Sequence, residues 1–195
     1  MMGYLKWKQN SRLFFDPTYP DIDFDTFNDR AQRKTFYGDV NEAIPPNAPD
    51  PRGKAVDLRM WVDSDHAGDN MTRRSRTGYF IFLNTVLIDW LSKKQATIEG
   101  SVFGVEFVAM KTGAKSLRGI RYKLRMMGVP LTRPTYVYGD NMSAIYNTSR
   151  PESTLKKKRN SICYHAVHKA VASGECLTTH CKTRDNYSDM ITKVL

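Results

Sequence analysis

Four acidic residues occupy positions for which a purely structural role is hard to assign. They lie beside apolar stretches or near a helix end, and they are Asp63, Glu106, Asp140 and Asp189. Glu106 lies within the most apolar part of the chain, where an unpaired buried carboxylate is energetically unfavourable. Clusters of carboxylate oxygens suit Mg²⁺ or Mn²⁺. Metal ions held between carboxylates and a phosphodiester indicate phosphoryl transfer on nucleic acid.

Each carboxylate also has an ordinary structural interpretation. Asp63 or Asp140 alone would fit a turn, and Asp189 alone would complement a helix N-terminus. A salt bridge to a basic residue would explain Glu106. The metal-site hypothesis therefore depends on whether the fold brings the four residues together.

The first elements around these residues predict a sheet covered by a helix. Alternation of apolar residues predicts a strand from Val56 that ends at Asp63, and two further strands over residues 77–84 and 86–91 form a hairpin. A long helix is predicted from about residue 100 to about residue 127. Because its first half is apolar nearly all round, we expect that half to be buried.

The second half of the chain continues the alternation of strands and helices. Residues 135–138 predict a short strand, and Asp140 follows it at the carboxyl end, where open α/β sheets place their sites. A short helix follows residue 141, and further helices are predicted over residues 160–172 and 186–193, with a strand over residues 175–181 between them. This order is typical of a mixed sheet with helices on its faces.

The charge of the chain is distributed unevenly. Its 195 residues carry a formal net charge of +10, but residues 90–195 hold 18 basic and only seven acidic residues. The excess lies in a run over residues 156–159 and in a cluster formed by Lys111, Lys115, Arg118, Arg121, Lys123 and Arg125. Such a surface attracts polyanions by counterion release, although charge runs are also typical of solvated helix faces. The run over residues 156–159 also fits a nuclear-localisation patch.

Other classes of protein and site have little support. No apolar run approaches the roughly 20 residues of a membrane helix. Three cysteines without a C-x-x-C pair argue against a disulfide framework or a zinc ribbon. Aspartates at positions 21, 23, 25 and 29 invite a calcium hypothesis, but their segment lacks the central Gly and terminal Glu of an EF-hand loop. His165 and His168 share a helix with Cys163, without the further ligands that zinc requires.

A series of short motifs runs through residues 56–195. It comprises residues 62–69 (VDSDHAGD), 73–79 (RRSRTGY), 90–95 (WLSKKQ), 106–110 (EFVAM), 138–145 (YGDNMSAI), 164–165 (YH) and 188–193 (SDMITK). In this order the motifs resemble the ribonuclease H domain at the C-terminal end of Ty/copia-type retrotransposon Pol polyproteins. Residues 1–55 resemble the segment that joins the reverse transcriptase to that domain, and no polymerase motif is present.

The resemblance implies a fold, an activity and a site. The fold would be α/β, a ribonuclease H-like mixed five-stranded sheet with helices on both faces. The activity would be metal-dependent endonucleolytic cleavage of the RNA strand of RNA–DNA hybrids, which are recognised by backbone shape and the 2′-OH. Carried over by motif, Asp63, Glu106, Asp140 and Asp189 would be the catalytic residues and the ligands of two Mg²⁺ (or Mn²⁺) ions about 4 Å apart. One ion would activate water, and the other would stabilise the leaving 3′ oxygen.

The resemblance also implies partners, domain limits and a location. We expect an RNA–DNA hybrid and the reverse transcriptase domain of the parent polyprotein as partners, and no membrane. Residues 1–55 would be a connection-like segment following a missing reverse transcriptase, and residues 56–195 the ribonuclease H-like domain. The expected location is intracellular, either cytoplasmic in a virus-like particle or nuclear.

The chain departs from the family pattern near its predicted ligands. Many relatives have a second Glu where this chain has Gly104, and Val102 interrupts a common serine pair, but neither change removes a predicted ligand. His180, nine residues before Asp189, lies where related enzymes keep a histidine that assists product release; a surface histidine is the alternative. Asp65 is the alternative to Asp63, and Asp185 is the alternative to Asp189.

Two other functions remain open. A catalytically inactive element remnant would bind hybrid or duplex through its basic clusters without cutting it. An integrase-like transferase would join DNA ends, but the order Asp, Glu, Asp, Asp favours ribonuclease H over an integrase, whose triad ends in Glu.

Overall fold

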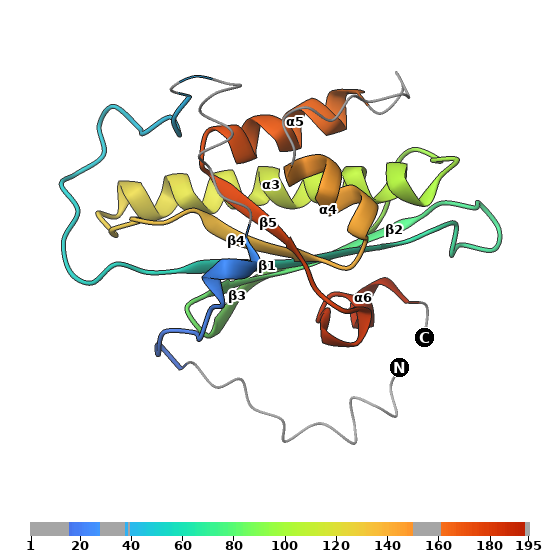
Figure 1. Ribbon diagram of the computed structural model, residues 1–195, viewed down its shortest axis with the longest axis horizontal. Coiled ribbons are helices and arrows are strands. Elements are labelled where there is room, and N and C mark those ends of the chain that lie inside the picture. Colours follow the sequence, from blue (N-terminus) through green and yellow to red (C-terminus); the bar gives the residue numbers. More distant parts are fainter. Residues whose placement is uncertain (1–15, 28–37, 39, 150–160, 194–195) are drawn as a thin grey trace.

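A five-stranded mixed sheet forms the centre of the molecule. The computed structural model describes residues 16–27, 38, 40–149 and 161–193. The strands are β1 (Leu58–Asp65), β2 (Arg76–Leu83), β3 (Val86–Lys94), β4 (Thr135–Gly139) and β5 (Cys176–His180), in the order β3-β2-β1-β4-β5 (Figure 1). Neighbouring strands among β1, β2 and β3 are antiparallel, whereas β4 pairs parallel to both β1 and β5.

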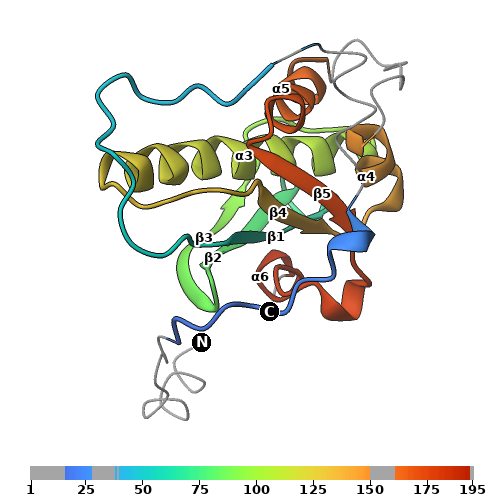
Figure 2. The same ribbon diagram turned by 60° about the vertical axis from the view of Figure 1, so that its left-hand side comes forward.

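Helices cover both faces of this sheet, as the two views in Figures 1 and 2 show. The helices are α3 (Val102–Met126), α4 (Met142–Ser149), α5 (Ser161–Ala172) and α6 (Asp189–Thr192), with short 3₁₀ turns η1 (Phe24–Thr26) and η3 (Thr183–Asp185). α3, α4 and α5 lie on one face, and α6 lies on the other. The predicted fold class and element order are confirmed. Within the described residues, no helix has the length and apolar character needed to cross a bilayer.

Alternation along β1 builds the core between the sheet and α3. Leu58, Met60 and Val62 are at most 1% exposed, and Met60 lies under α3 at Gly113, where an added Cβ would approach the Met60 sulfur to 2.7 Å. The opposite face of β1 carries Trp61, whose ring stacks on Tyr138 at 4.7 Å. The strand is therefore covered on both sides, which explains its near-continuous burial.

The residues before β1 pack along the sheet and along α3. Phe27 contacts the ring of Tyr136 at 4.9 Å, and Thr179 donates a hydrogen bond of 2.8 Å to the carbonyl of Thr26. Residues 40–57 form an irregular segment, which we call the strap, and its Arg52 amide donates to the carbonyl of Gly128, at 2.9 Å, after the end of α3.

Four local predictions need correction. β3 does not end at residue 91 but continues to Lys94, because its last three residues still pair with β2. β1 does not end at Asp63 but continues to Asp65, because Ser64 and Asp65 still pair with β2. Val102 is 49% exposed, so the apolar first half of α3 is not buried throughout. The last helix is α6 alone, and it begins at Asp189 rather than at residue 186.

The shorter last helix has a local physical cause. The Asn186 side chain donates a hydrogen bond of 3.1 Å to the carbonyl of Val62, which ties residue 186 to β1. Residues 183–185 form the turn η3 before this anchor. The chain therefore enters α6 from a fixed point on the sheet rather than from a preceding helical turn.

Candidate metal centre

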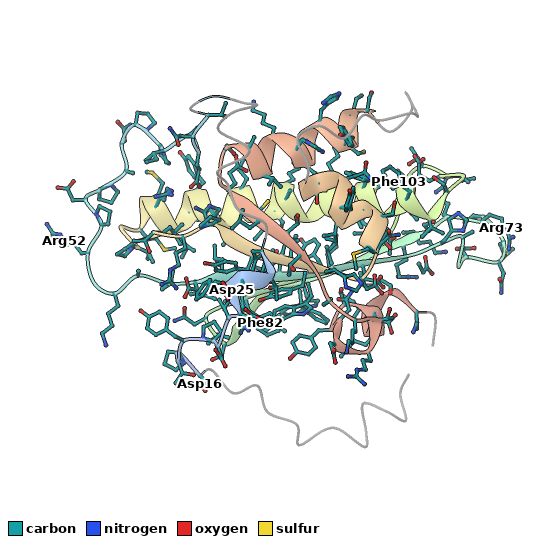
Figure 3. The ribbon with its side chains drawn as sticks, in the orientation of Figure 1. Asp16, Asp25, Arg52, Arg73, Phe82 and Phe103 are labelled. Atoms are coloured by element: carbon teal, nitrogen blue, oxygen red, sulfur yellow. The ribbon has the colours of Figure 1, made fainter. Side chains whose placement is uncertain are left out.

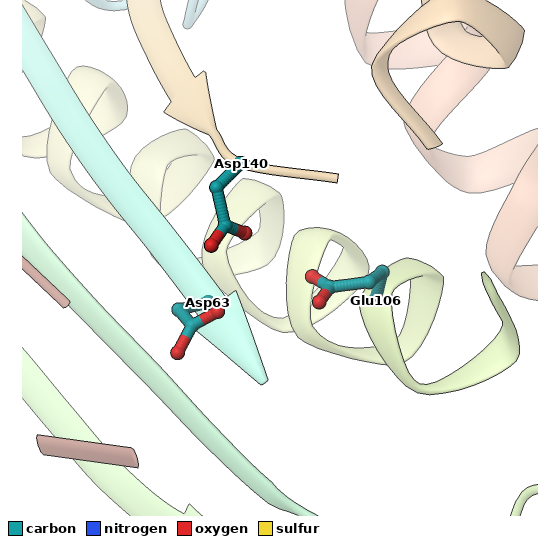
Figure 4. Close-up of side chains that lie close together, drawn as sticks. All are labelled: Asp63, Glu106 and Asp140. Carbon is teal, nitrogen blue, oxygen red and sulfur yellow. The ribbon is translucent and has the colours of Figure 1, made fainter. Parts of the chain in front are cut away.

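Three of the four predicted carboxylates meet at one edge of the sheet. Each of Asp63, Glu106 and Asp140 offers a carboxylate oxygen, and these oxygens all lie within 4.8 Å of one another (Figure 4). Asp63 lies on β1, and Asp140 follows β4 directly. Because β1 and β4 are parallel neighbours, their carboxyl ends reach the same edge.

Glu106 reaches this edge from the N-terminal part of α3. Ser101 caps the helix by accepting a hydrogen bond from the Gly104 amide at 3.2 Å. The buried Gln95 side chain donates to the Val105 carbonyl and to the Thr77 hydroxyl, both at 3.0 Å, and so joins the start of α3 to β2. These contacts fix the start of α3 and so position the side chain of Glu106, which is only 4% exposed.

Asp189 lies in the wall of the same cleft but outside the group of three. The cleft has a volume of about 390 Å³, and its lining includes all four predicted carboxylates. One Asp189 oxygen lies 2.6 Å from the ammonium nitrogen of Lys193, one helical turn further along. The structure thus brings Asp63, Glu106 and Asp140 together and leaves Asp189 beside them in an ion pair.

Two residues that the sequence reasoning did not consider hold α6 against this centre. Thr192, which is 1% exposed, donates its hydroxyl hydrogen bond to the Asp63 carboxylate. Asn186, besides its bond to β1, accepts a hydrogen bond of 2.6 Å from the Ser188 hydroxyl. The only signal in the sequence was the position of Thr192 one turn after Asp189, on the same side of a helix.

The site is electrostatically unfavourable for its own carboxylates. Burial raises the pKa of Glu106 to about 8, and the neighbouring charges of Asp63 and Asp140 contribute to that rise. Burial and the charge of Asp140 raise the pKa of Asp63 to about 6, although the hydrogen bond from Thr192 opposes the rise. Both raised pKa values mean that the site disfavours the ionised carboxylates, as expected where carboxylates converge away from water.

The donor set fits a hard divalent cation. Three carboxylates supply oxygen ligands, the type that Mg²⁺ and Mn²⁺ prefer. Among the described residues, no Lys or Arg forms an ion pair with Asp63, Glu106 or Asp140. A bound cation would compensate the charge that the protein itself leaves uncompensated.

The two alternative ligands have other roles in the structure. Asp65 lines the cleft, but one of its oxygens accepts the Arg76 amide at 2.5 Å and so closes the loop between β1 and β2. Asp185 is exposed beside Arg184 at 3.6 Å and does not line the cleft. The geometry favours Asp63 and Asp189 over them.

The structure gives the positions of the remaining histidines and of Cys181, and the role of His180 stays a prediction. His180 contacts the backbone carbonyl of Asp140 at 3.1 Å, so it borders the centre without lining the cleft. His165 is exposed, whereas His168 is buried and bonded to the carbonyl of Asn147. Burial raises the pKa of Cys181 to about 12, which makes it a poor nucleophile or ligand.

Three of the six basic residues in the α3 cluster form ion pairs within the protein. Arg121 and Arg125 each lie 2.6 Å from a carboxylate oxygen of Glu42, and Arg118 pairs with Glu175 at 2.9 Å. Its arginines therefore hold the fold together rather than forming a free basic surface. The second predicted cluster, residues 156–159, lies outside the described residues.

The calcium hypothesis gains no support. The three aspartates at positions 21, 23 and 25 are exposed, and Asp23 caps η1 by accepting a hydrogen bond from the Asp25 amide. Asp29 lies outside the described residues. Within the part of the chain that the structure describes, Asp63, Glu106 and Asp140 form the group with metal-ligand geometry.

Sequence comparison finds long relatives of which this chain matches one part. The chain is 32% identical over 144 residues to the retrovirus-related Pol polyprotein from transposon RE1 of Arabidopsis thaliana, covering 74% of this chain and 10% of that protein. For the polyprotein from transposon RE2 of the same plant, the identity is 31% over 144 residues, with the same coverage. The chain thus spans about a tenth of the length of these relatives. No protein-family model matches it.

Structure comparison finds the same fold. LC11-RNase H1, isolated from compost by a metagenomic approach, superposes with a TM-score of 0.54 at 12% identity, covering 69% of this chain and 91% of that one. The same protein in complex with an RNA/DNA hybrid also gives 0.54. At such low identity the likeness shows the fold, while the Pol polyproteins confirm the resemblance drawn from the motifs.

Proposed function

Because this chain is a ribonuclease H-like domain related to the retrovirus-related Pol polyproteins of copia-type transposons, we propose that it is a metal-dependent endonuclease that cuts the RNA strand of RNA–DNA hybrids. One observation carries the proposal. The oxygens of Asp63, Glu106 and Asp140 lie within 4.8 Å of one another at the carboxyl edge of the sheet. A structural neighbour, LC11-RNase H1, has been solved with an RNA/DNA hybrid, which supports this choice of substrate.

The four carboxylates would bind cations from different elements of the fold. Asp63, Glu106 and Asp140 would hold divalent cations through their converging oxygens, and Asp189 would join them from α6. Bound Mg²⁺ or Mn²⁺ ions would supply Lewis acidity that activates water and stabilises the leaving 3′ oxygen. Thr192 orients the Asp63 carboxylate, and Glu106, which is only 4% exposed, lines the same cleft.

Lys193 adds a positive charge to this arrangement. Its ammonium group neutralises Asp189 at 2.6 Å, at an exposed position next to the cleft. If Asp189 held a cation, the Lys193 ammonium group would no longer be needed to neutralise it and would be available to an anionic substrate. The family's polymerase partner and cellular location remain predictions.

The proposal is tested with purified protein and a hybrid labelled on its RNA strand. We expect RNA-strand cleavage in Mg²⁺ or Mn²⁺, none in EDTA, and none of a DNA–DNA duplex of the same sequence. Binding of the hybrid without cleavage in either metal would contradict the proposal and favour the inactive remnant. Joining of DNA ends would instead indicate an integrase-like transferase.

A further inference from the structure

A second cavity lies next to the metal centre. It has a volume of about 230 Å³ and is lined by Asp65, Gly68, Asp69, Asn70, Arg74, Arg76 and Lys94. Asp65 also lines the cleft that contains the carboxylates, so the two hollows share a wall. A chain-like ligand that extends from the metal centre past Asp65 would therefore pass over this cavity.

Three cationic side chains from different segments converge on the cavity. Arg74 comes from the loop between β1 and β2, Arg76 from the start of β2, and Lys94 from the end of β3. Figure 3 places this loop, marked by Arg73, at the opposite end of the molecule from Arg52 in the strap. We call the hollow formed by these residues the basic cavity.

The acidic side chains of the basic cavity are already bonded within the protein. Asp69 accepts hydrogen bonds from the amides of Met71 and Thr72, both at 3.0 Å, and pairs with Lys94. Asp65 accepts the Arg76 amide. These carboxylates therefore build the walls rather than offering a site for a cation.

By contrast, the guanidinium groups of Arg74 and Arg76 still have hydrogen-bond donors available. Among the described residues, no carboxylate pairs with Arg74 or Arg76. Arg76 donates one side-chain hydrogen bond, to the Ser92 hydroxyl at 3.2 Å. Five N–H donors on each guanidinium leave most of this capacity available to a ligand.

The walls of the basic cavity are held in a fixed shape. The Arg73 amide donates to the Asp69 carbonyl at 2.7 Å, and the buried Ser75 accepts the Ala67 amide at 3.0 Å. Gly68 lies directly against the Asp65 carboxylate, where an added Cβ would approach an oxygen to 1.9 Å. The backbone of such a loop needs little further ordering when a ligand binds to its arginines.

We propose that the basic cavity binds a backbone phosphate of the nucleic-acid strand whose neighbouring phosphodiester lies at the metal centre. The planar guanidinium matches a phosphate with paired hydrogen bonds. Contacts of this kind fix the register of a strand without reading its sequence. The inference rests on the proposed function, since it takes the strand in the cleft to be nucleic acid.

Binding measured without cleavage tests this inference. A fluorescently labelled RNA–DNA hybrid is titrated with protein in EDTA over a series of salt concentrations, and anisotropy gives the Kd. For the double variant Arg74→Gln/Arg76→Gln we expect about tenfold weaker binding and a salt slope smaller by about 1 for each phosphate that the variant no longer neutralises. The matched control Arg52→Gln/Lys54→Gln removes two exposed charges from the strap and should leave both values unchanged.

Further readouts separate this inference from the proposed function. Arg74→Lys/Arg76→Lys should restore most of the salt slope, because the charges return. In Mg²⁺ the Gln double variant should raise KM more than it lowers kcat. If the wild type cleaves the hybrid, and the Gln double variant has the same Kd and salt slope as the wild type, then the phosphate site is wrong and the proposed function stands. If the Gln double variant binds the hybrid more weakly but the wild type does not cleave it, then the proposed nuclease function is wrong and the phosphate site stands.

Discussion

At the scale of single residues, the carboxylates of the candidate metal centre repel one another when they are ionised, and a bound cation would relieve that repulsion. Glu106 and Asp63 are 4% and 5% exposed and face one another and Asp140 without a basic partner in the described residues. The pKa of Glu106 rises to about 8, and the pKa of Asp63 to about 6. The metal-free protein therefore holds protons that its unfolded chain would already have released.

This proton uptake gives the metal-free protein a pH-dependent stability. The folded pKa of Glu106 lies above its ordinary value of 4.5, so its contribution is fully present below about pH 4.5 and is lost as the pH rises to about 8. In EDTA we expect the Tm to fall over this range and Glu106→Gln to flatten the fall. At about pH 8 the variant should be more stable by at least about 1 kcal/mol, or about 2–4 °C.

Two controls accompany this prediction. Glu99→Gln changes a half-exposed glutamate outside the cluster and should leave the pH dependence as it is. Adding Mg²⁺ to the wild-type protein should raise the Tm more at high pH than at low pH, because the cation binds the ionised carboxylates. A Tm that is independent of pH in EDTA would contradict the electrostatic description of the site.

Thr192 is predicted to act as a positioning residue for Asp63. Thr192→Val keeps the shape of a side chain that is 1% exposed but removes its hydrogen bond to the carboxylate. Because that bond lowers the pKa of Asp63, its loss should move the pH midpoint of Mn²⁺ binding upward. We expect cleavage to fall by about 10–100-fold, as for other residues that orient metal ligands.

The conservative variant decides whether the hydroxyl itself matters. Thr192→Ser should restore the pH midpoint and most of the activity. If Thr192→Val changes only the Tm, while Mn²⁺ binding and its pH midpoint stay the same, the residue has a purely structural role.

The sequence predicted the chemistry of the centre better than its supports. Asp63, Glu106 and Asp140 were found because carboxylates beside apolar stretches are unusual. The parallel pairing of β1 and β4 brings Asp63 and Asp140 together, and α3 adds Glu106. Thr192 and Asn186 were not found, because an ordinary hydroxyl or amide gains its role only from the contact made in the fold.

At the scale of elements, the short helix α6 depends on one glycine of β2. Gly78 pairs with Asp63 across the sheet, and α6 lies directly on it. A Cβ added at Gly78 would approach the Thr192 methyl to 2.6 Å and the Ser188 carbonyl oxygen to 3.2 Å. The glycine therefore allows α6 to bring both Thr192 and Asp189 to the cleft.

Gly78→Ala is predicted to displace α6 and impair the centre. The backbone oxygen cannot give way as a flexible side chain would, so we expect a loss of about 1–3 kcal/mol in stability together with weaker Mn²⁺ binding and slower cleavage. Differential scanning calorimetry and metal titration measure the two effects.

Gly119→Ala is the matched control for this substitution. Gly119 lies within α3 with nothing within 4 Å of an added Cβ, so alanine should stabilise the helix by about 0.5–1 kcal/mol. Equal behaviour of the two alanine variants would show that α6 does not depend on the close contact at Gly78.

Sequence patterns predicted the long elements and misjudged the short one. β1 and α3 carry clear periodicities of 2 and 3.6 residues, and both were found within a few residues of their ends. The extent of α6 was overestimated because the Asn186 anchor to the Val62 carbonyl replaces a helical turn. Such an anchor depends on a residue 124 positions away, which no local pattern contains.

At the scale of the whole molecule, the strap is tied to α3 by a fork of charges. Glu42 accepts hydrogen bonds from Arg121 at 2.6 and 2.7 Å and from Arg125 at 2.6 Å. Burial alone would raise the pKa of Glu42, but the two arginines hold it below its ordinary value. The positive charges that suggested a polyanion surface on α3 thus serve partly to join the strap to the domain.

Glu42→Gln is predicted to loosen this connection. It leaves Arg121, which is 2% exposed, without its carboxylate partner, so we expect a loss of about 1.5–3 kcal/mol in chemical denaturation. The metal centre lies at the other end of α3, so cleavage at low temperature should change little. Asp185→Asn, which removes an exposed pair with Arg184, should cost less than about 1 kcal/mol. Equal stability of the two variants would contradict a structural role for the fork.

The most direct test of the central claim is cleavage of a labelled RNA–DNA hybrid by wild type and Asp140→Asn in Mg²⁺. Asp140→Asn keeps the side-chain shape but removes one charged ligand from the group within 4.8 Å. We predict at least about 100-fold slower cleavage of the RNA strand, with hybrid binding retained and with Asp185→Asn as active as wild type. Cleavage by Asp140→Asn at the wild-type rate would contradict the assignment of the carboxylate cluster as the metal-dependent nuclease centre.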